Sequence, residues 1–283
     1  MPELPEVETV RSTLAPVLRG RMLERVAILD GRLTRPEAPE AVAAELEGEQ
    51  VADVRRRGKY LIVVFASGRH LLVHLRMTGS FQHPVADGPD PHRRAVVTLD
   101  DGADVAYRDV RRFGTWLLLE PGELDAYLDE RIGGEPLERA FTTVRFARAL
   151  EGRRAPIKGA LLDQRAVAGV GNIYADEALW HARLHPERSA GDLEPDEVAA
   201  LRRAIRRALR LGIARQGATL RDYRDANGRA GAMQHEFRVY GRGGEPCERC
   251  GTPIAKTRVA GRSTWFCPTC QPAAAAERSV RTS

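Results

Sequence analysis

The stretch "CERCGTPIAKTRVAGRSTWFCPTC", residues 247–270, holds all four cysteines of the chain as two C-x2-C pairs. In a chain without a secretion signal, this spacing favours a zinc site over disulfides. Four sulfur ligands leave no open coordination position, so the predicted zinc ion is structural and is not a Lewis acid. Its predicted ligands are Cys247, Cys250, Cys267 and Cys270.

The segment between the two cysteine pairs predicts a β-hairpin that turns at Ala260 and Gly261. Lys256, Arg258 and Arg262 give this hairpin a positive charge, which suits contact with the phosphates of a nucleic acid. A zinc ribbon that only caps the fold is the alternative interpretation.

Upstream of this finger, the chain has a strand-rich part followed by a helical part. Short apolar runs such as "KYLIVVF", "HLLVHLRM" and "AVVTL" lie between turns from about residue 20 to about residue 120, which predicts a β-sandwich or barrel. A helix that begins near Pro2 and stops near Gly20 precedes them. After Gly133 the pattern becomes helical, and "DEVAALRRAIRRALRLGI" predicts an amphipathic helix.

These patterns predict an α+β fold, with an N-terminal β-sandwich and flanking helices followed by a helical domain that carries the finger. We expect domain boundaries at 1–132, 133–236 and 237–271, with a disordered tail at 272–283.

The net charge of +5 over 283 residues comes from clustered arginines, as in "RRRGKY" and "LRRAIRRALR". Basic patches favour polyanions, so nucleic acid is the leading partner class, although a genome rich in G and C would also enrich arginine. No run approaches the roughly 20 apolar residues of a membrane-spanning helix, and no signal peptide opens the chain. We therefore expect a cytoplasmic protein without membrane contact.

The opening "MPELPE" places Pro2 where a small residue normally allows removal of the initiator methionine. A terminal amine has a reference pKa near 7.7–8.0, against about 10.4 for lysine, so about a tenth of it is free base at neutral pH. Such an amine can attack a sugar C1′ and form an iminium, with Glu3 beside it as a proton shuttle. An exposed terminus with charged capping residues is the alternative.

The stretch "GVGNIYADEAL", residues 169–179, allows a tight turn directly before a helix. Backbone N–H groups and the Asn172 amide could hold a phosphate there, although ordinary helix capping explains the same pattern.

The chain resembles the bacterial formamidopyrimidine-DNA glycosylases. The resemblance rests on "MPELPEVETVR", "RRGKYL", "HLRMTGSF", "DVRRFGTW", "GVGNIYADEAL" and the four-cysteine finger, from Pro2 to about Gln271. It implies a helix-two-turn-helix in the helical domain and a bifunctional glycosylase and abasic-site lyase of base excision repair. The implied substrate is double-stranded DNA with oxidised purines, such as 8-oxoguanine or formamidopyrimidines, or with abasic sites. We expect a monomer associated with the nucleoid.

By this resemblance Pro2 is the nucleophile that forms a Schiff base, and Glu3 is its acid/base partner. Lys59 matches the lysine that assists base loss and β-elimination, and Arg262 matches the arginine linked to δ-elimination.

Other matched residues would contact DNA. Met77, Arg111 and Phe113 match the residues that fill the space left by the extruded nucleotide, where an apolar wedge and a ring replace lost stacking. The residues matched to phosphate contacts are His92, Arg153, Lys158 and Asn172.

The chain departs from the family pattern in two loops. Arg76 and Thr78 replace the glycine and serine of "HLGMSG", and Ala232 and Met233 replace an aromatic pair in the loop over the extruded base. A glycosylase of the endonuclease VIII branch, which acts on oxidised pyrimidines, is the nearest alternative. Leu4 and the set of Met77, Arg111 and Phe113 favour the purine branch. A catalytically silent lesion-binding protein is a further alternative, against which the intact Pro2, Glu3 and Lys59 argue.

Overall fold

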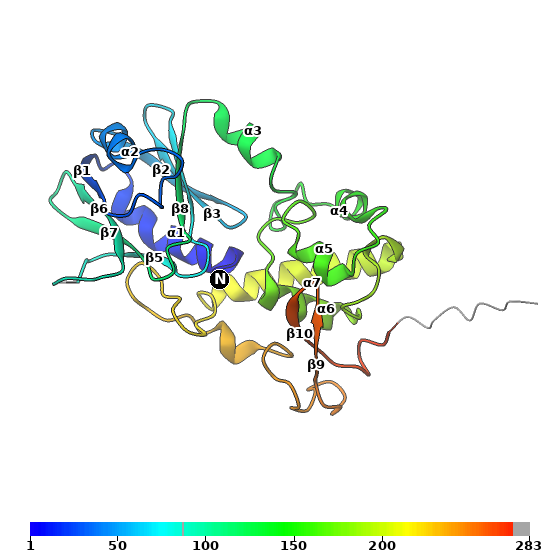
Figure 1. Ribbon diagram of the computed structural model, residues 1–283. Helices are drawn as coiled ribbons and strands as arrows, with labels where there is room; N and C mark the ends of the chain where they lie inside the picture. The colour runs from blue at the N-terminus through cyan, green and yellow to red at the C-terminus, as the bar shows by residue number, and fades with distance from the viewer. Residues whose placement is uncertain (87, 274–283) are drawn as a thin grey trace, which may run out of the picture. The chain divides into compact units, whose positions relative to one another are not determined.

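The computed structural model describes residues 1–86 and 88–273, which form two compact units (Figure 1). The first unit combines Met1–Glu135 with Leu209–Glu236, and the second combines Pro136–Ala208 with the described residues 237–273. From residue 274 on, the predicted disordered tail lies outside the described residues.

Two antiparallel four-stranded sheets build the first unit. One has the order β1 (Leu23–Ile28), β6 (Arg93–Leu99), β7 (Asp104–Asp109), β5 (Gly79–Gln82), and the other has the order β2 (Val51–Arg57), β3 (Tyr60–Phe65), β4 (His70–His74), β8 (Thr115–Leu119). Both sheets contribute buried residues to a single apolar core, as Leu61 and Leu99 do. The predicted sandwich is therefore confirmed.

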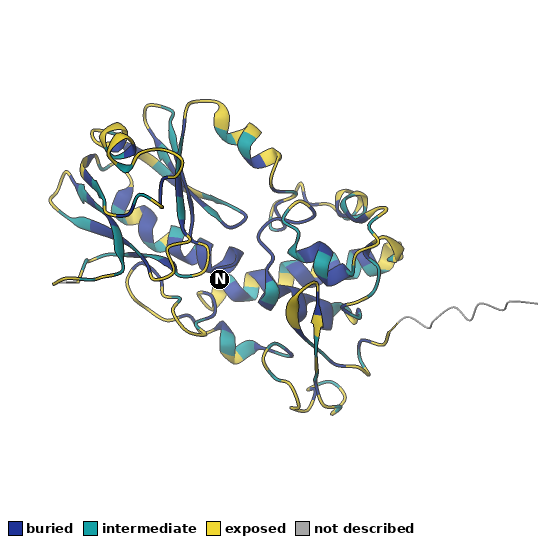
Figure 2. Ribbon diagram, viewed as in Figure 1, coloured by how far each residue is buried: buried dark blue, intermediate teal, exposed yellow. Residues whose placement is uncertain are grey.

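Three helices flank the sheets, namely α1 (Leu4–Leu18), α2 (Pro39–Leu46) and α3 (Glu123–Asp129). Helix α1 forms as predicted because Val7, Val10 and Leu14 recur at helical spacing and are buried in the same core (Figure 2). It begins one residue after Glu3, which is its N-cap, and it ends two residues before Gly20.

The second unit consists of short helices and the finger. Its helical elements are α4 (Thr143–Leu150), α5 (Ile157–Leu162), α6 (Asn172–Ala182), the 3-10 turn η1 (Ala190–Asp192) and most of α7 (Pro195–Ala214). The finger hairpin is β9 (Ala255–Val259) and β10 (Arg262–Phe266), joined through Ala260 and Gly261 at φ +49° and +74°. Two positive φ values are what a two-residue hairpin turn requires, so the predicted turn is confirmed.

The compact units differ from the predicted domains at 209–236. This segment, with the 3-10 turn η2 (Met233–Glu236), belongs to the first unit. Among its contacts there, the Ala218 N–H donates to the buried Glu6 carboxylate at 2.8 Å. None of the helices that the structure describes is long and apolar enough to cross a membrane.

Candidate active site

Pro2 and Glu3 are buried immediately before the first turn of α1. The Glu6 carboxylate accepts the Glu3 N–H at 2.8 Å and completes a capping box. A helix N-terminus stabilises a carboxylate and disfavours a protonated amine, so this position supports both predicted roles. Met1 precedes Pro2, whose nitrogen is therefore an amide until Met1 is removed.

Glu6 is a positioning residue that the sequence prediction missed. One carboxylate oxygen holds the Glu3 backbone and the other holds Ala218, so Glu6 fixes the N-terminus against the segment that follows α7. Gly217 lies at φ +80°, and a Cβ there would come within 2.8 Å of the Glu6 Cγ. The only local sign was a second glutamate three residues after Glu3.

Lys59 lies in the turn between β2 and β3 and is only 5% exposed. The buried Glu135 carboxylate fixes this turn, because it accepts the Gly58 N–H at 2.8 Å and pairs with Arg56 at 2.9 Å. Gly58 itself has φ +57°, a conformation that favours glycine. Glu135 is thus a second residue that the sequence prediction missed.

His74 faces this turn from the neighbouring strand. It pairs with Tyr60 across the sheet, and the two rings meet edge to face at 4.9 Å. Burial lowers the pKa of His74 to about 3, and the charges of Arg76 and Lys59 add to the effect. The ring is therefore neutral at physiological pH, and its Nδ1 accepts the Arg76 N–H at 3.0 Å, at the start of the turn that carries Met77.

The three residues predicted to fill the extrusion site lie on two exposed loops of the first unit. Met77 is 38% exposed and Phe113 is 52% exposed, which is unusual for large apolar side chains. The guanidinium of Arg111 stacks 4.9 Å from the centre of the Phe113 ring. A wedge, a ring and a hydrogen-bond donor are thus available to a base stack.

The second unit holds Lys158 and Arg262, which lie in very different surroundings. Arg262 is exposed at the tip of the finger, as a phosphate contact requires. The predicted phosphate contact of Lys158 is inconsistent with the structure, since Lys158 is 0% exposed. Its ammonium pairs with the buried Asp176 at 2.7 Å and donates to the Ser263 carbonyl and the Thr264 hydroxyl.

Lys158 therefore anchors the finger instead of facing solvent. Asn172 donates to the same Ser263 carbonyl at 3.1 Å, and Asp176 accepts the Trp265 N–H at 3.1 Å. Lys158 of α5 and Asn172 and Asp176 of α6 thus form hydrogen bonds with the backbone of β10, the strand that begins with Arg262.

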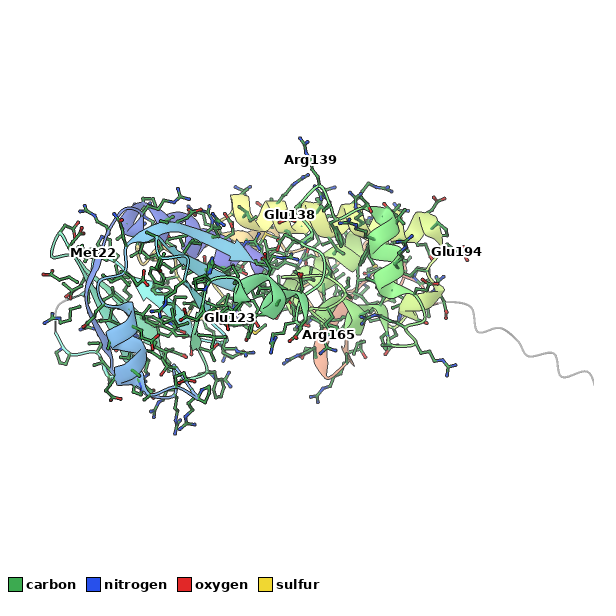
Figure 3. All side chains as sticks on the ribbon, turned by 90° about the horizontal axis from the view of Figure 1, so that it is seen from above. Met22, Glu123, Glu138, Arg139, Arg165 and Glu194 are labelled. Atoms are coloured by element: carbon green, nitrogen blue, oxygen red, sulfur yellow. The ribbon has the colours of Figure 1, made fainter. Side chains whose placement is uncertain are left out.

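The remaining predicted phosphate contacts are partly exposed. Arg153 is bound to Asp163 at 2.6 Å, and the N–H of His92 is held by the Asp90 carboxylate at 2.8 Å. Surface arginines occur elsewhere on the second unit, and Arg139 projects outward in Figure 3.

The four cysteine sulfurs lie within 4.8 Å of one another. A tetrahedral zinc ion with Zn–S bonds of about 2.3 Å needs sulfurs about 3.8 Å apart, so the four side chains fit this ion. The Trp180 indole N–H donates to the Cys247 sulfur at 3.5 Å, which stabilises a thiolate. The metal would hold the finger and take no part in the reaction.

Comparison with known proteins matches three parts of the chain to domain families. Residues 1–116 match the formamidopyrimidine-DNA glycosylase N-terminal domain, residues 132–224 match its H2TH domain, and residues 244–273 match the zinc finger found in FPG and IleRS. The formamidopyrimidine-DNA glycosylase of Herpetosiphon aurantiacus is 47% identical over 96% of this chain and 100% of its own length. This chain belongs to the formamidopyrimidine-DNA glycosylase family.

Solved structures of family members are similar throughout. The MutM (Fpg) protein of Thermus thermophilus is 43% identical, with a TM-score of 0.86 over 95% of this chain and 98% of its own. A Lactococcus lactis FPG mutant in complex with Fapy-dG-containing DNA is 38% identical, with a TM-score of 0.89 over 96% of this chain and 100% of its own. The expected family, enzyme class and zinc finger are therefore confirmed.

Proposed function

We propose that this protein excises oxidised purines from double-stranded DNA and then cleaves the strand at the abasic site. The observation that carries this proposal is the buried proline at the positive end of α1, followed directly by the Glu3 carboxylate. Attack on a sugar requires a nucleophile and a proton carrier, and these two adjacent residues supply both once Met1 is removed.

In the proposed reaction the Pro2 amine, freed by removal of Met1, attacks C1′ of the damaged nucleotide. The glycosidic bond breaks, the base leaves with the bonding electrons, and a proton from an acid such as Glu3 or Lys59 neutralises it. The C1′–O4′ bond then breaks, O4′ takes a proton from Glu3, and the opened sugar is held to Pro2 as an iminium. This iminium acidifies the C2′ proton, and loss of that proton expels the 3′ phosphate. A second elimination, assisted by Arg262, expels the 5′ phosphate and leaves a one-nucleotide gap. Hydrolysis of the iminium by water then releases the sugar fragment and restores the free Pro2 amine.

In this proposal, two groups of residues contact the DNA. Met77, Arg111 and Phe113 fill the duplex where the nucleotide is extruded, and Arg262 and Asn172 contact phosphates. The substrate class is supported by a similar Lactococcus lactis protein solved with DNA that contains Fapy-dG, and by another complex with an abasic site. The site of action is the bacterial nucleoid in the cytoplasm.

Borohydride trapping tests this function. Protein from which Met1 has been removed is mixed with duplexes that carry 8-oxoguanine or an oxidised pyrimidine, reduced, and mapped by mass spectrometry. We expect a cross-link at Pro2 that favours 8-oxoguanine opposite cytosine, and its loss in Pro2→Gly with retained DNA binding. Preference for the pyrimidine lesion would refute the proposed purine specificity, and tight binding without a cross-link would refute the proposed Schiff base.

A further inference from the structure

The two loops that carry the exposed Met77 and Phe113 meet at one buried carboxylate. Asp109 ends β7 and is 1% exposed. Its Oδ1 accepts the Thr78 hydroxyl at 2.5 Å and the Arg111 N–H at 3.2 Å, and its Oδ2 accepts the Gly114 N–H at 2.7 Å. We call residues 75–79 the Met77 loop and residues 110–114 the Phe113 loop. The Asp109 side chain therefore accepts hydrogen bonds from both loops.

Thr78 also joins the two loops directly. Its hydroxyl donates to Asp109 and accepts the Arg111 N–H at 2.9 Å, so it closes a ring of three hydrogen bonds. The threonine that replaces the family serine keeps this hydroxyl and adds a methyl group that restricts its rotamer.

Close packing beneath the carboxylate fixes the loops further. A Cβ added to Gly79 would come within 2.2 Å of the Tyr107 hydroxyl, and one added to Gly114 would come within 1.9 Å. Both loops therefore lie against the same buried tyrosine, two residues before Asp109 on β7.

The middle of the Phe113 loop has its own anchor. Arg112 adopts φ +58° and binds the buried Asp30 through two hydrogen bonds of 2.5 and 2.9 Å. Because Arg112 is tied to Asp30 in this way, the loop is held at its centre while its neighbours Arg111 and Phe113 remain exposed.

We propose that Asp109 and Thr78 are positioning residues that hold the two loops as one rigid insertion unit for the duplex. This inference rests on the proposed function, in which Met77, Arg111 and Phe113 enter the space of the extruded nucleotide. Loops that are already ordered lose little conformational entropy on binding, and a misplacement of about 1 Å can cost on the order of 100-fold in rate.

Thr78→Val tests the bridge, because it removes the hydroxyl and keeps the shape of a half-buried side chain. The matched control is Thr98→Val, which deletes a similar threonine–aspartate hydrogen bond, to Asp104 at 2.7 Å, elsewhere on the same sheet. We expect single-turnover excision of 8-oxoguanine from duplex DNA to fall about tenfold or more in Thr78→Val and less than twofold in Thr98→Val. Thr78→Ser keeps the hydroxyl and should excise 8-oxoguanine at the wild-type rate.

A second measurement separates positioning from general damage to the fold. Borohydride trapping at a preformed abasic site in single-stranded DNA involves no stacked duplex, so Thr78→Val should trap within twofold of wild type. In a Met77→Ala background, Thr78→Val should slow excision less than it does alone, because both changes act on the same step.

The outcomes distinguish this inference from the proposed function. If Met77→Ala slows excision but Thr78→Val matches Thr98→Val, the bridge is refuted and insertion stands. If Thr78→Val also loses single-stranded trapping, it damages the active site generally and the positioning role is refuted. If Met77→Ala and Phe113→Ala both excise at the wild-type rate, the insertion role in the proposed function fails.

Discussion

We expect the wild-type protein to lose unfolding free energy as the pH falls from neutral to mildly acidic, and we expect His74→Asn to reduce this loss. Burial lowers the pKa of His74 from 6.5 to about 3, so the folded protein resists a proton that the unfolded chain accepts. The stabilising contribution is complete above pH 6.5 and is lost as the pH falls toward 3. Each pH unit below 6.5 costs about 1.4 kcal/mol, so about 2 kcal/mol is lost by pH 5.

Asparagine suits this test because its Oδ1 occupies the place of the ring Nδ1 and can still accept the Arg76 N–H. The variant loses the ring contact with Tyr60 and should be less stable at both pH values. The unfolding free energy is measured by urea denaturation, followed by circular dichroism, at pH 7 and pH 5. We expect the wild type to lose about 2 kcal/mol more than the variant between these two values, and an equal loss in both proteins would refute the buried neutral histidine.

Three further changes probe the second unit and the packing under the loops. Cys250→Ala should release the zinc ion, measured by atomic emission, and lower duplex affinity about tenfold or more because the finger loses its fold, whereas retained zinc would argue against four-sulfur ligation. Lys158→Met leaves Asp176 buried without its cation and should cost roughly 3–5 kcal/mol in urea denaturation, with partial recovery on adding Asp176→Asn. Gly114→Ala should cost about 1–3 kcal/mol through collision with the Tyr107 hydroxyl, and Tyr107→Phe should recover part of that loss in a thermal melt.

The sequence predicted those elements whose residues repeat with a clear period. Helix α1 and strand β3 were found because Val7, Val10 and Leu14 recur at helical spacing and "YLIVVF" is an apolar run. Strands β5 and β7 were missed because "GSFQ" is short and "DVAYRD" begins and ends with an acid. Their pairing partners decide their conformation, and a local pattern does not contain those partners.

The same limit applies to the candidate site. The four cysteines stand in a short motif whose spacing predicts their cluster. Pro2 and Lys59 also stand in short motifs, so the resemblance could assign their roles, which stay predictions. Glu135 was missed because it accepts a backbone N–H that is 77 residues away in sequence. Glu6 has a local partner in the Glu3 N–H, but its bond to Ala218 joins residues 212 positions apart and shows in no local pattern. The phosphate contact of Lys158 was assigned from the family resemblance. It fails because Lys158 is buried against Asp176, and neither its burial nor this ion pair shows in the local sequence.

The division of α7 between the two units bears on how the protein is made. The first unit is interrupted after Glu135 and resumes only at Leu209, within the same continuous helix whose earlier turns belong to the second unit. During synthesis, the N-terminus must wait for Ala218 to emerge before Glu6 can bind its backbone. A ribosome-bound chain that ends at residue 135 would therefore carry both sheets but an unfinished active site, and no contiguous fragment shorter than residues 1–236 can contain the complete first unit.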